Sequence, residues 1–390
     1  MELSLLPFHS ALDLYQRQAE ELLSAHQAGD ARALRVFHEN HPRFLDPNIV
    51  WLPRRLAESE IREAALGIAD SQLALARWYC FENWAALAEF AGAVTQNDSP
   101  VYRFESAIEA VIAGDLAMLK SLLRKRPELI RARSIRVTPF DPPVHRAALL
   151  HYLAANGVEG YRQKTPDNAV EIARTLLEAD ADVDALADLY GGQCTTMSLL
   201  VSSSPPAKAG LQVALIDTLA DFGAALDARG SGNWVSPVIT ALAFGFGEAA
   251  EALVRRGAAV DSLAAAAGLG RLDDAVRLLP AATPDNRHRA LALAAQLGRV
   301  QIVRLLVEAG EDPDRYNPEG THAHSTPLHQ AVIAGRGEVV RFLVERGVKL
   351  DIKDTIYQGT PLGWANHAGQ IEIAEYLRSR GAKTAEELAP

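Results

Sequence analysis

The chain has 390 residues, of which 48% are hydrophobic and 23% are charged, and its formal net charge is −10 at pH 7. This composition allows a buried core, yet no stretch approaches the roughly 18 consecutive apolar residues that span a membrane. An acidic balance also argues against a general nucleic-acid surface, which needs basic residues to displace counterions from phosphates.

The start of the chain and its cysteine content indicate the compartment. The first residues lack the basic start and apolar run of a signal peptide. Cys80 and Cys194 are too few and too far apart to suggest a disulfide framework. We therefore expect a cytoplasmic protein with neither nucleic-acid nor membrane partners.

The region 1–95 is predicted to be helical. Residues 12–26 and 31–40 predict one helix pair, and residues 59–79 and 84–94 predict two further helices. Aromatic residues near the last two helices are expected to form a local core, because large aromatic side chains are usually buried: Trp78, Tyr79, Phe81 and Trp84. The polar stretch 96–100 is the best candidate linker to a second domain, residues 101–390.

A basic run follows, from Arg124 to Arg136. It includes Arg126, Arg131 and Arg133. Charge runs are usually solvated, so we interpret this run as an exposed face.

The next segment departs from regular spacing. One helix is expected over residues 144–154 and another over 169–178, with an insertion at 156–168 between them. A second insertion, residues 202–210, occupies the equivalent turn of the next unit, so the two should be neighbours. Extra loops on a rigid frame are commonly functional.

The first insertion carries groups suited to polar recognition. Arg162 is able to fork onto a carboxylate or phosphate, which suggests a small anionic ligand. Asn156 and Gln163 supply amides beside it, and Glu159 and Tyr161 supply a carboxylate and a phenol.

Two histidines precede the insertion. His151, with Glu159 and Tyr161, forms a weak set of catalytic candidates for proton transfer. His145 is a binding candidate, but an uninterrupted helix would turn positions 145 and 151 to different faces. Whether the chain has any catalytic activity stays open, and we lean towards a non-enzyme.

The clearest pattern lies near the C-terminus. Thr326-Pro327-Leu328-His329 recurs 34 residues later as Thr360-Pro361-Leu362-Gly363. Thr caps a helix through its hydroxyl, and Pro suits the first helical position, where no backbone donor is needed. The glycines that follow the second helices, Gly347 and Gly381, are also 34 residues apart. This spacing gives about seven or eight units over the chain.

The period and the opening phrase resemble the ankyrin-repeat family. Further phrases, at 70–77, 149–163 and 190–196, resemble a group of bacterial ankyrin proteins with a helical N-terminal region and an insertion in an early repeat. The resemblance implies an all-α ankyrin-repeat solenoid, for which the helical N-terminal region would serve as a cap.

The resemblance also implies a protein partner on the concave surface that fingers and first helices form. Tyr190, Trp234 and Tyr357 occupy finger positions, and Trp364 lies in a first helix, so these four are partner-binding candidates. Packing of fingers on each other explains Tyr190 and Trp234 equally well.

Metal and cofactor signals are weak. His322 and His324 place two imidazoles on one side of an extended finger, but a third ligand is not assured. No phosphate-binding loop occurs, so we predict neither a metal nor a cofactor.

The leading hypothesis is a protein-recognition scaffold. The alternative is a small-molecule binding protein or enzyme with a polar pocket built by residues 156–168.

Overall fold

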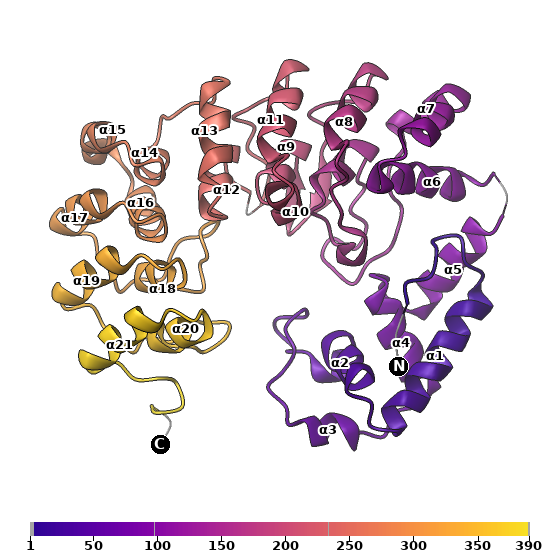
Figure 1. Cartoon of the computed structure of the whole chain (residues 1–390), viewed down its shortest axis with the longest axis horizontal. Coiled ribbons are helices and arrows are strands. Elements are labelled where there is room, and N and C mark those ends of the chain that lie inside the picture. Colours follow the sequence, from indigo (N-terminus) through magenta and orange to yellow (C-terminus); the bar gives the residue numbers. More distant parts are fainter. Residues whose placement is uncertain (1–3, 97, 233, 389–390) are drawn as a thin grey trace. The chain divides into compact units, whose positions relative to one another are not determined.

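The computed structural model describes residues 4–96, 98–232 and 234–388, and it divides after Leu211 into two compact units. Helices account for nearly all of the regular structure (Figure 1), and the described residues contain a single two-stranded sheet. The all-α prediction is therefore confirmed. None of the helices described is long and apolar enough to cross a membrane.

Unit 1 begins with a helical region that surrounds its own apolar core. Its elements are α1 (Leu12–Gln27), α2 (Ala31–Asn40), η1 (Pro42–Phe44), α3 (Glu58–Arg62), α4 (Ile68–Trp78) and α5 (Trp84–Val94). Tyr79 and Phe81 are each only 2% exposed, and Trp78 and Trp84 pack against the same core. The expected burial of this aromatic group is confirmed.

One predicted helix in this region is wrong. Residues 59–79 form two helices, because the chain is extended at Gly67 and a new helix starts there. The Asp70 carboxylate accepts a hydrogen bond from the Gly67 backbone N–H at 2.8 Å, which satisfies a donor at the new helix start.

Helix α6 starts directly after Ser99, at the end of the predicted linker. Ser99 caps α6 by accepting a hydrogen bond from the Tyr102 N–H. Asn97, part of the predicted linker, lies outside the described residues. The division into domains 1–95 and 101–390 stays a prediction.

The second half of unit 1 contains the irregular segments. Its elements are α6 (Pro100–Ala113), α7 (Leu116–Lys125), η2 (Pro127–Arg131), η3 (Leu149–Ala154), η4 (Gly160–Arg162), α8 (Ala169–Glu178), β1 (Ala187–Leu189), β2 (Gly192–Cys194), α9 (Thr196–Leu200) and α10 (Ser204–Lys208). Helix α8 has the predicted bounds. The helix expected over 144–154 is reduced to the 3-10 helix η3, which ends where Ala155 adopts a left-handed φ of 46°.

A short hairpin joins α8 to α9. Strands β1 and β2 pair antiparallel, with Leu189 opposite Gly192. The two residues between them, Tyr190 and Gly191, both have positive φ values of 55° and 76°. This is the backbone geometry that two-residue hairpins favour, and it places the Tyr190 side chain at the hairpin tip.

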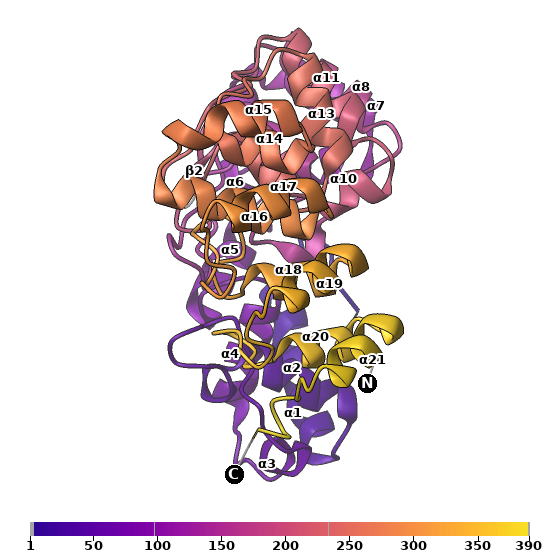
Figure 2. The same ribbon diagram turned by 90° about the vertical axis from the view of Figure 1, so that its left-hand side faces the viewer.

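Unit 2 is built from stacked helix pairs (Figures 1 and 2). It starts with α11 (Gln212–Asp221), and the pairs that follow are α12 (Pro237–Ala243) with α13 (Gly247–Arg255), α14 (Leu263–Leu269) with α15 (Leu272–Leu278), α16 (Pro284–Gln296) with α17 (Val300–Glu308), α18 (Pro327–Ile333) with α19 (Gly337–Glu345), and α20 (Pro361–His367) with α21 (Ile371–Ser379). First helices pack on first helices along the stack, as α14, α16, α18 and α20 do. The 3-10 turn η5 (Leu279–Ala281) follows α15.

The two copies of the repeated phrase start helices at the same place, but only Thr360 caps its helix through the hydroxyl. The Thr326 hydroxyl instead lies 2.9 Å from His329 Nδ1. Helices α18 and α20 begin at Pro327 and Pro361, each directly after a threonine. The Thr360 hydroxyl accepts a hydrogen bond from the Gly363 N–H at 3.2 Å and donates one to the Lys383 carbonyl at 2.7 Å. Thr360 therefore caps α20 and also ties the start of this helix to the segment that follows α21.

Candidate functional site

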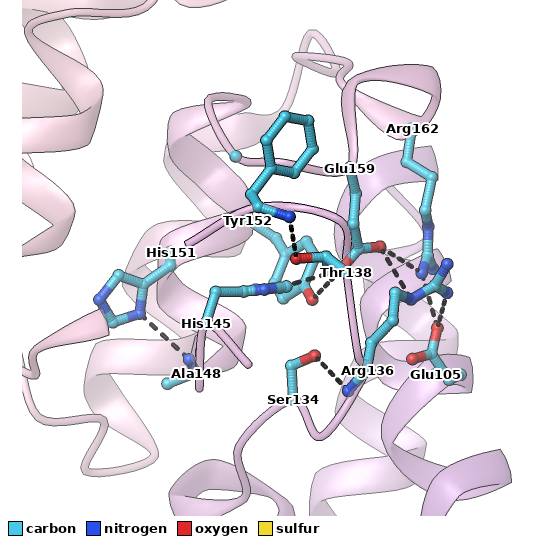
Figure 3. Close-up of polar contacts among 12 residues, drawn as sticks. Glu105, Ser134, Arg136, Thr138, His145, Ala148, His151, Tyr152, Glu159 and Arg162 are labelled. Atoms are coloured by element: carbon cyan, nitrogen blue, oxygen red, sulfur yellow. Dashed lines mark hydrogen bonds and ion pairs between the residues drawn. The ribbon is translucent and has the colours of Figure 1, made fainter. Parts of the chain in front are cut away.

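The carboxylate of Glu159 is the centre of a buried polar cluster in unit 1 (Figure 3). Its Oε1 accepts a hydrogen bond from the Tyr152 hydroxyl at 2.9 Å and lies 3.1 Å from His145 Nε2. Its Oε2 lies 3.0 Å from Arg162 Nη1 and 3.5 Å from Arg136 Nε. Burial alone would raise the pKa of this carboxyl, but the two guanidinium groups and His145 outweigh burial and lower it to about 2. Glu159 is therefore a fixed negative charge.

Arg162 joins the first insertion to helix α6. Its Nη1 lies 2.6 Å from Glu105 Oε2, and its Nη2 lies 2.9 Å from Glu109 Oε1. The Arg162 side chain is only 5% exposed. The first insertion therefore buries this arginine, and its guanidinium is engaged by Glu105, Glu109 and Glu159.

Arg136 completes the cluster, and the interpretation of its segment as an exposed basic face is wrong for this residue. Its side chain is 1% exposed, and its guanidinium carbon lies 4.5 Å from the ring centroids of both Phe81 and Phe90. Its Nη2 lies 3.3 Å from Glu105 Oε2, and its Nη1 donates a hydrogen bond to the Tyr161 hydroxyl at 2.7 Å. The cluster therefore ties the N-terminal helical region to the insertion.

Two other members of the basic run have exposed side chains, as predicted, whereas Arg133 is half-buried and donates hydrogen bonds to the Arg146 and Leu186 carbonyls. Arg126 lies 2.8 Å from Asp98, and Arg131 forms an ion pair with Asp180, all with exposed side chains. Exposed pairs of this kind contribute little to stability.

Sequence reasoning missed Glu105, Arg136 and Tyr152 as members of the cluster. A weak signal was present for Arg136, because alternate residues of an extended segment point to one side. Ser134, Arg136 and Thr138 are all buried, whereas Ile135 between them is 66% exposed. Nothing in the sequence marked Glu105 or Tyr152.

His145 contacts Glu159 directly, whereas His151 lies beside the cluster and is hydrogen-bonded to backbone groups. The Nδ1 atom of His151 accepts a hydrogen bond from the Ala148 N–H at 3.1 Å, and its Nε2 lies 3.0 Å from the Ala185 carbonyl oxygen. Burial lowers the pKa of His151 to about 4, and burial also lowers the pKa of His145. Because η3 replaces the expected α-helix, both histidines reach one cavity, which an uninterrupted helix would not allow.

The cavity is small. Its volume is about 30 Å³, and its polar lining residues are His145, His151, Tyr152, Asn156, Glu159, Arg162 and Gln163. That volume holds roughly two water molecules, whereas pockets for small molecules usually measure about 300–1,000 Å³. The sequence therefore identified residues that the fold does bring together. The deep polar pocket required by the small-molecule alternative is not found at this cluster.

The two insertions are neighbours, as expected. Asn156 Nδ2 donates hydrogen bonds to the Ser202 hydroxyl at 2.6 Å and to the Leu199 carbonyl at 3.1 Å. The Ser203 hydroxyl donates to the Ala155 carbonyl at 3.2 Å. These bonds fix the insertions to each other. The first insertion is also braced internally, where Gln163 Nε2 donates to the Gly157 carbonyl.

Tyr190 and Trp234, two of the aromatic finger candidates, differ in exposure to solvent. Tyr190, at the hairpin tip in unit 1, is 47% exposed, and its hydroxyl donates a hydrogen bond to Asn156 Oδ1 at 3.1 Å. Trp234 is half-buried in the segment that precedes α12 in unit 2. Asn233 beside it lies outside the described residues.

A second group of candidates forms an aromatic surface in unit 2. We call it the finger surface, and it consists of Phe244, His322, His324, Tyr357 and Trp364. Ring centroids are 6.3 Å apart for Phe244 and His322, and 6.1 Å apart for the two histidines. His324 lies 6.0 Å from Tyr357 and 5.8 Å from Trp364. Phe244 and Tyr357 are 52% and 46% exposed, so the surface reaches solvent at both ends.

The buried carboxylate of Asp354 holds the last finger in shape. Its Oδ1 accepts hydrogen bonds from the Ile356 and Tyr357 N–H groups, at 3.0 and 2.5 Å. Its Oδ2 accepts from the Gly359 N–H at 2.7 Å and from Trp364 Nε1 at 3.0 Å. Asp354 is fully buried, so Tyr357 is presented from a rigid turn.

The histidines of the finger surface are neutral structural groups. His322 Nε2 lies 2.8 Å from the Ala243 carbonyl oxygen, which links the finger before α18 to the end of α12. Burial lowers the pKa of both His322 and His324. Across the described ranges, no three His, Cys, Asp or Glu side chains gather as metal ligands would.

Comparisons with known proteins agree with this repeat architecture. Residues 207–354 and 291–387 match the family described as ankyrin repeats (3 copies). The chain is 35% identical over 88 residues to the putative E3 ubiquitin-protein ligase XBAT31 of Arabidopsis thaliana, a match that covers 23% of this chain and 18% of the relative. It is 34% identical over 82 residues to the palmitoyltransferase Hip14 of Drosophila melanogaster, over 21% of this chain and 12% of the relative. The chain thus spans less than a fifth of the length of these relatives.

Proposed function

Because residues 207–387 match the ankyrin-repeat family, we propose that unit 2 binds a protein partner through the finger surface. Ankyrin repeats generally mediate protein–protein interaction, and solenoids offer extended surfaces for it. The observation that carries the proposal is the contiguous, partly exposed aromatic array from Phe244 to Tyr357.

The array has the chemistry of an interface anchor. Tyrosine and tryptophan dominate interface hot spots because they bury a large area with few rotatable bonds. The Asp354 turn fixes Tyr357 before binding, so little conformational entropy is lost when a partner contacts it.

The five side chains of the finger surface are uncharged near pH 7, which indicates the chemistry of the partner. The two histidines of this surface have lowered pKa values and stay neutral near pH 7. We expect the partner to present an apolar or aromatic segment here. A stable interface buries about 800 Å² on each side, so the partner would also cover groups around these five residues.

Site-specific photo-crosslinking tests the proposal. A benzoylphenylalanine placed at Tyr357 should crosslink to a protein in lysate from the native cells. The same group at Ile371, which is 71% exposed in α21 but is not part of the finger surface, serves as the matched control. Equal crosslinking from both positions, or none from Tyr357, would contradict the proposal.

The partner identified in this way allows a quantitative test. Tyr357→Ala should weaken its binding by about thirtyfold, the loss typical of a hot-spot residue. Ile371→Ala should leave the affinity unchanged.

A further inference from the structure

An extended segment of unit 1 has no part in the proposed function. Residues 133–137, which we call the edge segment, run antiparallel to residues 143–147. The Ser134 N–H donates a hydrogen bond to the Ala147 carbonyl at 2.9 Å. One side of the edge segment is therefore paired within the fold.

Further extended stretches continue the arrangement on that paired side. The Asp188 N–H in β1 donates a hydrogen bond to the His145 carbonyl at 2.8 Å, and β1 pairs with β2. Among the described residues, no strand or bridge pairs with the other side of the edge segment. The edge segment is thus the outermost of these stretches, and an open strand edge is a template for another extended chain.

Main-chain groups of the edge segment are available on its open side. Alternate residues of an antiparallel strand direct their N–H and carbonyl groups to the same side, so Arg133, Ile135 and Val137 face away from residues 143–147. In the part of the chain that the structure describes, no protein group bonds the N–H or carbonyl of Ile135 or the N–H of Val137. The Glu82 N–H donates to the Val137 carbonyl at 2.9 Å, so this side already accepts one main-chain donor.

An apolar groove lies next to the edge segment. Its volume is about 220 Å³, and it is lined by Phe81, Phe90, Val101 and Phe104 together with Ile135. The Ile135 side chain is 66% exposed. The groove is smaller than the roughly 300–1,000 Å³ of small-molecule pockets. It is suited instead to a side chain of a strand laid along the edge, since alternate side chains of such a strand point to one face.

One carboxylate gives the groove its free charge. Arg136 and Glu105, both buried, line the groove and are bonded to each other, as Figure 3 shows. The Arg133 guanidinium donates to the Leu186 carbonyl at 2.8 Å, on the paired side of the edge segment. Glu89 lines the groove, is exposed, and forms no ion pair among the described residues. The groove therefore favours a ligand with a basic group beside its apolar one.

We propose that an extended segment of a partner protein adds to the edge segment as a further strand and places an apolar side chain in the groove. Its main chain bonds the open N–H and carbonyl groups of Ile135, and a Lys or Arg of the partner faces Glu89. In strand addition, main-chain hydrogen bonds give affinity and pockets for alternate side chains give specificity. This site lies in unit 1 and is distinct from the finger surface of unit 2.

Peptide selection on the full chain tests the proposal. A phage-displayed library of random linear peptides is depleted on the variant Ala93→Phe and then selected on the wild-type protein. Ala93 is half-buried in α5 and lines the groove, so a phenylalanine at this position fills the groove. We expect enrichment of peptides with an apolar residue next to Lys or Arg. A selection that enriches no peptide would overturn the proposal.

Backbone methylation of a selected synthetic peptide identifies the binding mode. Each peptide amide is N-methylated in turn, which removes one donor and blocks that side of the peptide. Methylation of an amide that faces the edge segment should weaken binding by about tenfold, and methylation of its neighbours should have little effect. The losses should therefore alternate along the peptide, as the two sides of a strand do. Losses without this alternation, as for a bound helix, would contradict strand addition.

Matched variants test the protein side of the contact. Ile135→Pro removes the central N–H of the edge segment and should weaken peptide binding by about tenfold. Ala85→Phe adds the same ring as Ala93→Phe, but at an exposed position of α5 outside the groove, and should bind as the wild type does. Glu89→Gln should weaken binding by about threefold and reduce its salt dependence, whereas Glu39→Gln, exposed in α2, should do neither. Equal losses in the two phenylalanine variants would overturn the proposal.

Amide hydrogen exchange gives a readout that needs no substitution, so it serves even if Ile135→Pro does not fold. Bound peptide should slow exchange at the N–H groups of Ile135 and Val137 and leave exchange in α21 unchanged. Peptide binding without slower exchange at these two amides would overturn strand addition. Light scattering tests the alternative that two copies of the chain pair through this edge. A wild-type dimer that Ile135→Pro dissociates would show that a second copy, and not a partner segment, occupies the edge.

Discussion

Replacing Arg162 with methionine should destabilise unit 1 strongly. The substitution keeps a long side chain but removes the cation that contacts Glu105, Glu109 and Glu159 at 2.6 to 3.0 Å. The two glutamates at positions 105 and 159 are 3% and 4% exposed, so water does not replace the lost partner. Arg136 alone then balances two buried carboxylates.

The expected loss is about 3–5 kcal/mol in the free energy of unfolding, as for other buried ion pairs broken on one side. For a unit of this size, such a loss lowers the melting temperature by roughly 6–20 °C. The loss should shrink as pH falls, because a glutamate without its cation has a raised pKa and can become neutral. Adding Glu159→Gln to the variant should restore part of the stability, since it removes the uncompensated charge.

Urea unfolding followed by circular dichroism measures the change, and hydrogen exchange in α6 and α8 assigns it to unit 1. The control is Arg131→Met, which breaks the exposed ion pair with Asp180 and should change stability by about 0–1 kcal/mol. If Arg162→Met also changes stability by less than about 1 kcal/mol, the cluster does not hold the insertion in place.

Two further predictions concern acid stability and packing. His151 and His329 have pKa values lowered by burial to about 4, so the unfolded chain takes up protons before the folded chain does. Stability should therefore be full above about pH 6.5 and fall by about 3 kcal/mol per histidine as pH drops to 4, and a flat series of urea midpoints across that window would contradict this. Separately, a Cβ at Gly268 would lie 2.7 Å from the Leu242 Cδ1 atom, so Gly268→Ala should lower stability by about 1–3 kcal/mol. Gly337→Ala, with open space around its Cβ, should not lower it, and equal effects in a thermal melt would show that the predicted overlap is relieved.

Local patterns predicted much of the fold. Helix α8 has the predicted bounds, Ala169–Glu178, and α18 and α20 start at the prolines of the repeated phrase. These features depend on side-chain spacing, caps and turns within a few residues. The same rules predicted continuous helices over 59–79 and 144–154. In the structure the first is interrupted at Gly67, and the second is a short 3-10 helix that ends at Ala155.

Rules that use only neighbouring residues could not predict the polar cluster around Glu159. Arg162 and Glu105 are 57 positions apart in the chain, and Arg136 and Glu105 are 31 apart. Only the folded chain brings these residues together, so the sequence suggested an external anion for Arg162 and not the chain's own glutamates. The finger surface was partly predictable, because Tyr357 and Trp364 stand at recognisable repeat positions. Phe244 was not singled out, since its exposure depends on its place at the end of α12.

Native mass spectrometry of the protein isolated from its own cells tests the central claim most directly. We predict a protein partner bound in a fixed ratio and lost from the variants Tyr357→Ala and Phe244→Ala, but retained by Ile371→Ala. A partner that stays bound to both finger-surface variants, or a bound small molecule with no protein partner, would contradict recognition through the finger surface.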